Sequence, residues 1–150
     1  MSDARSIPSP EAAREELSRR ADAIEGGYEM MLAYAAQGLA TDQGAANSAQ
    51  LRDHLERFDA ALTGLADAYR ACAAALGVGP PAALEGVLTA VAADAAVTQA
   101  MLRLVLGQPG ISSQMIDNLN ASIHVRALLT DVFVVDEILK NAKAGSGSEN

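Results

Sequence analysis

The chain has 150 residues, of which 50% are hydrophobic but only 3% aromatic, and it contains no tryptophan. This length favours one domain with a buried core, and the abundance of alanine, leucine and valine suits closely spaced helices better than a β-sheet. A formal charge of −8 argues against nucleic acid and against an anionic membrane surface as partners, because both attract clustered lysine and arginine.

The first two expected helices are marked by residues typical of helix ends. Ser9, followed by proline at the first helical position, starts a helix that ends near Gly38. Asn47 or Ser48 can cap a second helix, which runs to Gly77. Each segment is long enough to cross a small domain from end to end.

Two stretches rich in glycine and proline, GVGPP and GQPGISS, separate the remaining helices. The third expected helix runs from about Pro81 to Leu106. Ser112 or Ser113 then caps a fourth helix that lasts to about Asn141. The residues expected to form the core stripe of this fourth helix are Ile116, Leu119, Ile123, Ala127, Thr130, Val134 and Ile138.

Apolar residues in all four segments are spaced in alternating steps of three and four, which is the pattern of left-handed bundle packing. Helices of roughly 26 to 31 residues, about 40–45 Å long and joined by short connections, predict an all-α fold. The expected arrangement is an antiparallel up-down-up-down four-helix bundle with long helices. We expect this single domain to span residues 9–141, with residues 1–8 and the Gly/Ser-rich tail 142–150 disordered.

The third and fourth expected helices carry more apolar surface than one bundle core can bury. Between residues 71 and 116 the only charged residues are Glu85, Asp94 and Arg103, whereas a bundle helix that faces water is polar on its outer side. We therefore expect a homo-oligomer, most simply a two-fold dimer through these two helices, with a protein partner on the same face as the alternative. The expected interface residues are Val97, Met101, Leu104, Leu128, Val132, Val135 and Leu139.

Residues 23–32, AIEGGYEMML, place two adjacent glycines inside a helix, where each costs roughly 1 kcal/mol relative to alanine. In one interpretation a glycine at mid-bundle level opens a polar pocket for a ligand or ion. The residues expected to line that pocket are Gly27, Tyr28, His54, Asp94, Asn120 and His124. In the other interpretation, which we favour, Gly27 lets a neighbouring helix approach closely. Gly26 points outward, where a kink or a contact with a second subunit would explain it.

The sequence lacks the patterns of the common cofactor sites of helical bundles. A di-iron carboxylate site needs glutamate three residues before histidine on two helices, but Leu51 and Ala121 stand three residues before His54 and His124. The single cysteine, Cys72, excludes an intramolecular disulfide and any CxxC motif, and its core position favours a small buried hydrophobe. We therefore expect no metal and no cofactor.

These observations predict a cytoplasmic, non-catalytic helical-bundle protein that acts by homo-oligomerisation and protein–protein association, as a scaffold, adaptor or accessory protein. The chain opens without an apolar leader segment, and no uncharged apolar run reaches the ~18 residues of a membrane span. The alternative is a ligand- or metal-binding bundle, acting as a sensor or an enzyme, with its pocket around Tyr28, Asp94 and His124.

Overall fold

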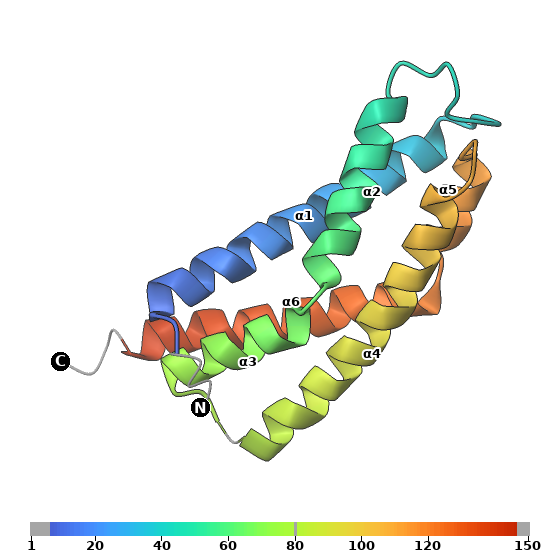
Figure 1. Cartoon of the computed structure of the whole chain (residues 1–150). Coiled ribbons are helices and arrows are strands. Elements are labelled where there is room, and N and C mark those ends of the chain that lie inside the picture. Colours follow the sequence, from blue (N-terminus) through green and yellow to red (C-terminus); the bar gives the residue numbers. More distant parts are fainter. Residues whose placement is uncertain (1–6, 80, 147–150) are drawn as a thin grey trace, which may run out of the picture.

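The computed structural model describes residues 7–79 and 81–146, the last four of them as backbone only. Within these residues the chain is all-α, as predicted, with six helices and no strand (Figure 1). The helices are α1 (Pro10–Ala36), α2 (Ser48–Leu62), α3 (Leu65–Leu76), α4 (Pro81–Leu106), α5 (Ser113–Asn120) and α6 (Ile123–Ser146).

The helix starts expected at serine residues are confirmed by their hydrogen bonds. The Ser9 hydroxyl accepts a bond of 3.1 Å from the amide of Ala12, and the Ser112 hydroxyl accepts one of 3.0 Å from Met115. At the other end of the chain, α6 continues past Asn141 to Ser146. The expected disorder of residues 1–6 and 147–150 lies outside the described residues.

The second expected helix is divided into α2 and α3 by Thr63 and Gly64. Thr63 has an extended backbone and Gly64 adopts a left-handed φ of 73°, a conformation that glycine reaches at little cost. Arg20 of α1 holds this break, because its Nη1 donates to the carbonyls of Ala61 and Thr63 at 2.8 and 2.6 Å. A basic side chain thus satisfies backbone oxygens that the interrupted helix leaves free.

The fourth expected helix is divided into α5 and α6 at residues 121–122, and this break overturns its predicted core stripe. Ile116 and Leu119, before the break, are buried as expected, but after it Ile123, Val134 and Ile138 are 75%, 49% and 51% exposed. The buried residues of α6 are Val125, Leu128, Leu129, Val132, Val135 and Leu139.

The same break corrects the expected interface. Leu128, Val132, Val135 and Leu139 are core residues of the single chain and are not free to contact a second one. The physical reason is that a helical period of 3.6 residues predicts a face only within one continuous helix. An interruption changes both the axis and the phase of the segment that follows.

Two groups of helices share the core. Helix α1 packs against α2, α3 and α5, while α4 packs against α2, α3 and α6. The central side chains include fully buried aromatic and aliphatic residues of α1, α2, α3 and α4, namely Tyr34, Phe58, Tyr69, Leu88 and Leu102. Helices α2 and α3 therefore hold α1 and α4 together.

The adjacent glycines lie where α1 meets α2. A Cβ atom on Gly27 would stand 2.5 Å from Cδ2 and 2.9 Å from Cβ of the buried Phe58 side chain. Only glycine therefore permits α1 and α2 to approach this closely. A Cβ atom on Gly26 would stand 3.6 Å from Cδ2 of His54, one turn earlier on α2. The packing interpretation of Gly27 is supported, and Gly26 faces a histidine of its own chain, without need of a second subunit.

Candidate functional site

The first three residues of the expected mid-bundle pocket lie near the contact between α1 and α2. Gly27 is buried against Phe58, and Tyr28 is half-buried at the edge of the core. His54 is half-buried beside Gly26, with its Nδ1 2.8 Å from the carbonyl oxygen of Gln50 on its own helix. Gly27 and Tyr28 thus belong to a helix–helix contact, whereas His54 lines an open hollow of about 290 Å³ beside Gly26.

The other three residues lie elsewhere. His124 is exposed in the first turn of α6, and Asn120 ends α5 with its Oδ1 buried and without a partner among the described residues. Asp94 of α4 faces Asp131 of α6, which is about two turns, or roughly 10 Å, from His124 along that helix. The sequence places His124 at the same level along the bundle as Asp94 by counting along one continuous helix. The count does not hold, because the helix is interrupted between Asn120 and Ile123.

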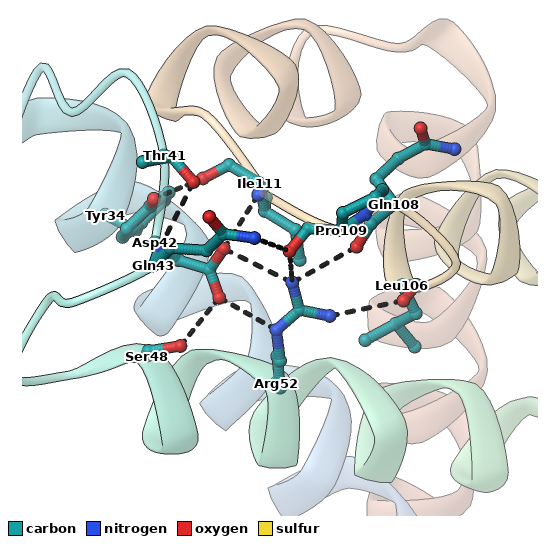
Figure 2. Close-up of polar contacts among 10 residues, drawn as sticks. All are labelled: Tyr34, Thr41, Asp42, Gln43, Ser48, Arg52, Leu106, Gln108, Pro109 and Ile111. Atoms are coloured by element: carbon teal, nitrogen blue, oxygen red, sulfur yellow. Dashed lines mark hydrogen bonds and ion pairs between the residues drawn. The ribbon is translucent and has the colours of Figure 1, made fainter.

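A buried ion pair that the sequence does not reveal holds one end of the molecule. Asp42, in the loop between α1 and α2, is 1% exposed. Its Oδ2 accepts hydrogen bonds from Nε of Arg52 (2.8 Å) and Oγ of Ser48 (2.6 Å), and its Oδ1 accepts one from the Ile111 amide (2.7 Å), as Figure 2 shows. The Arg52 guanidinium holds the pKa of this carboxyl far below its ordinary range.

Arg52 also satisfies the end of α4. Its guanidinium donates to the carbonyls of Leu106 and Gln108 at 3.2 Å and to that of Pro109 at 3.4 Å (Figure 2). These oxygens belong to the last residue of α4 and to the turn after it, so they have no hydrogen-bond donor within the helix. One arginine thus joins the start of α2 to the turn between α4 and α5.

Tyr34 and Ser113 connect this hydrogen-bond network to α1. The Tyr34 hydroxyl donates to the Ile111 carbonyl, and the Ser113 hydroxyl donates to the Tyr34 carbonyl at 2.7 Å. The Leu39 amide in turn donates to Ser113 Oγ at 2.9 Å. These hydrogen bonds join α1, the loop that follows it, and the residues just before and at the start of α5, so we interpret the network as a structural clamp.

Two carboxyl groups meet in the seam between α4 and α6. Asp94 and Asp131 are partly buried, and burial, together with a hydrogen bond and charge repulsion from Asp94, raises the pKa of Asp131 to about 7. The Asp131 carboxyl therefore keeps its proton to a higher pH than an ordinary aspartate. No cluster of three or more histidine, cysteine or acidic side chains suited to a metal occurs in the described part of the chain.

The acid pair predicts that stability rises as the pH falls. Because the folded chain holds a proton on Asp131 up to pH 7, whereas an unfolded aspartate loses it near pH 4, acidification from pH 8.5 to 5.5 favours the folded state. We expect a gain of about 1–2 kcal/mol in the free energy of unfolding, since solvent screens this partly exposed pair. Urea unfolding at both pH values measures the gain.

Asp131→Asn tests the origin of this pH dependence. The variant should unfold with nearly the same free energy at pH 8.5 and 5.5, whereas Asp117→Asn, at an exposed acid on α5, should keep the wild-type dependence. Equal pH dependence in the wild type and in Asp131→Asn would show that Asp131 is not its source.

Large apolar side chains remain exposed on both sides of this seam. We call this surface the α4–α6 face and define it by Val87, Val97, Leu104, Ile123, Val134 and Ile138. Val87, Val134 and Ile138 also line an apolar groove of about 180 Å³ between the two helices. On each helix the members lie within about 100° of arc, on the side of the acid pair.

The charged residues of α4 point to its other side. Glu85 pairs with Arg70 of α3 at 2.6 Å, and Arg103 pairs with Asp59 of α2 at 3.1 Å. Asp94 is therefore the one charged residue that α4 directs to the α4–α6 face. Of the expected interface residues on α4, Val97 and Leu104 are exposed here and Met101 is half-buried.

Helix α4 is apolar along most of its length. Among the described residues it is the one helix that could cross a membrane by length and composition, with a mean hydropathy of 1.3 over its most apolar 18 residues. Core helices of soluble proteins meet the same test, but only 28% of this window is buried. Much of α4 is therefore left uncovered by the described part of the chain.

Comparison with known proteins assigns no family to this arrangement. No protein-family model, no curated protein and no solved structure matches the chain.

Proposed function

We propose that this protein acts by association and not by catalysis: the chain forms a homo-oligomer, most simply a two-fold dimer, through the α4–α6 face. In this proposal it is a cytoplasmic scaffold, adaptor or accessory protein. We further propose that the six helices, grouped as α1, α2–α3, α4 and α5–α6, follow the up-down-up-down order of a four-helix bundle.

The observation that supports the proposal is the group of exposed apolar side chains beside the seam, three of which line one groove. Leu104, Ile123 and Ile138 are 69%, 75% and 51% exposed, and clustered aliphatic side chains of this kind mark association surfaces. A two-fold axis near the acid pair would place each apolar groove against the same region of the second copy, because a two-fold interface pairs one patch with itself. A different protein with an apolar helix could use the same face.

Glutamate substitutions on the α4–α6 face test the oligomer. Val134→Glu and Ile138→Glu should each raise the dimer dissociation constant at least tenfold, because a charge in an apolar interface loses its hydration without gaining a partner. Analytical ultracentrifugation over a range of protein concentrations measures the change. Unfolding curves at low concentration check that each variant still folds.

Phe133→Glu is the matched control. Phe133 is 54% exposed on the same helix, but it points about 100° away from Val134 and lies outside the face. The proposal fails if the wild type is a monomer at all concentrations or if the control weakens association as much as the other two. Co-sedimentation of the monomer with phosphatidylcholine vesicles would instead identify lipid as the occupant.

A further inference from the structure

A cavity of about 360 Å³ opens to solvent between α1 and α6, and Cys72 of α3 forms part of its wall. Helix α3 packs against both of its neighbours, whereas α1 and α6 have little direct contact, so a space remains between them. Its volume lies within the range of small-molecule sites. The lining residues are Arg14, Leu17, Ser18, Ala21, Cys72, Asp136, Leu139 and Lys140.

The inner part of this cavity is apolar. Leu17 of α1 and Leu139 of α6 belong to the core and stand on opposite walls, and Cys72 of α3 is buried between them. Burial raises the pKa of the Cys72 thiol, so this group remains neutral and apolar in character. Such a wall suits a short alkyl chain.

Two basic side chains line the same cavity without acidic partners. Of the nine lysine and arginine side chains that the structure describes, six are in ion pairs, and the other three are Arg14, Arg126 and Lys140. Arg14 and Lys140 both reach the cavity. In a chain with 19 acidic residues and 11 basic ones, two unpaired cations at one opening mark a place for an anion.

Asp136, the one acidic residue that lines the cavity, already accepts a hydrogen bond. The Tyr69 hydroxyl donates to Asp136 Oδ1 at 2.9 Å, so Asp136 is held toward α3 and forms no ion pair with either described cation. Burial, together with the charge of the nearby Glu25, raises the pKa of this carboxyl. Among the residues that line the cavity, two cations thus stand against one acid, even though the whole chain is strongly negative.

We propose that this cavity binds a small amphiphilic carboxylate, such as a medium-chain fatty acid. The alkyl chain lies along Leu17, Ala21 and Leu139, and the carboxylate accepts hydrogen bonds from Arg14 and Lys140 at the opening. This site is separate from the association proposed above, because it uses the side of α6 that faces α1 and α3.

Titration with decanoate below its micelle concentration, followed by calorimetry, tests the proposal. Arg14→Gln and Lys140→Gln should each weaken binding about tenfold, because each removes a charged hydrogen-bond donor. Arg126→Gln is the matched control, since Arg126 is also a described cation without an ion pair but does not line the cavity. It should leave the affinity unchanged.

A second variant and a second probe keep the test decisive. Ala21→Leu fills the apolar part and should abolish binding while the chain stays folded. Decyltrimethylammonium, which has the same chain length and the opposite charge, should not bind. The proposal is overturned if decanoate does not bind at millimolar concentration, if the cation binds as tightly, or if Ala21→Leu binds like the wild type.

Discussion

Replacing Asp42 by alanine is expected to lower the free energy of unfolding by about 3–5 kcal/mol, which is a large share of the stability of a small domain. The substitution leaves the half-buried Arg52 guanidinium without its counter-charge, which lies at a position shielded from water. It also removes the acceptor of the Ser48 hydroxyl and of the Ile111 amide. Unpaired buried groups of this kind carry most of the loss.

Urea unfolding followed by circular dichroism measures this effect, with Asp53→Ala as its control. Asp53 pairs with Arg57 at 2.7 Å on the exposed surface of α2, and an exposed pair contributes at most about 1 kcal/mol. A double-mutant cycle with Arg52→Leu should give a coupling energy of about 2 kcal/mol or more between Asp42 and Arg52. Similar losses from Asp42→Ala and Asp53→Ala would contradict the clamp.

The two buried acids act in opposite directions as the pH changes. The folded pKa of Asp42 is depressed, so its contribution is complete above the unfolded value near 4 and is lost as the pH falls below it. The folded pKa of Asp131 is raised, so its contribution is lost as the pH rises through about 7. Because the Asp131 contribution already declines as the pH rises from about 4 to 7, these two acids together place maximal stability near pH 4.

Exchange of the two adjacent glycines for alanine should have opposite effects on stability. Gly27→Ala is expected to lower the free energy of unfolding by about 1–3 kcal/mol, because its methyl group would overlap the Phe58 side chain. The overlap includes Cβ of Phe58, which cannot move without the α2 backbone. The close approach of the two helices would have to open.

Gly26→Ala is the internal control for this prediction. Its methyl group would make an ordinary contact of 3.6 Å with the His54 ring, and alanine is the better helix former by about 0.5–1 kcal/mol. We expect a gain of that size. Urea unfolding of both variants under one condition measures the difference, and a gain from Gly27→Ala would mean that no close packing occurs there.

The local features of this fold are determined by the sequence alone. Ser9 and Ser112 act as helix caps, and the glycine- and proline-rich breaks separate the helices where they are expected. The all-α class also follows from composition and apolar spacing. These features depend on residues within one or two turns of each other, so their physical chemistry is visible in a short stretch of sequence.

Tertiary structure decided which residues face inward and which polar groups meet. The interruption at residues 121–122 rotates α6, so Leu128 and Val132 join the core and Val134 becomes exposed. Asp42 and Arg52 look like ordinary surface residues in the sequence, yet they hold together a loop, a helix start and a turn more than fifty residues further on. A periodic pattern carries no phase across a break, and charge pairing depends on distance in space and not along the chain.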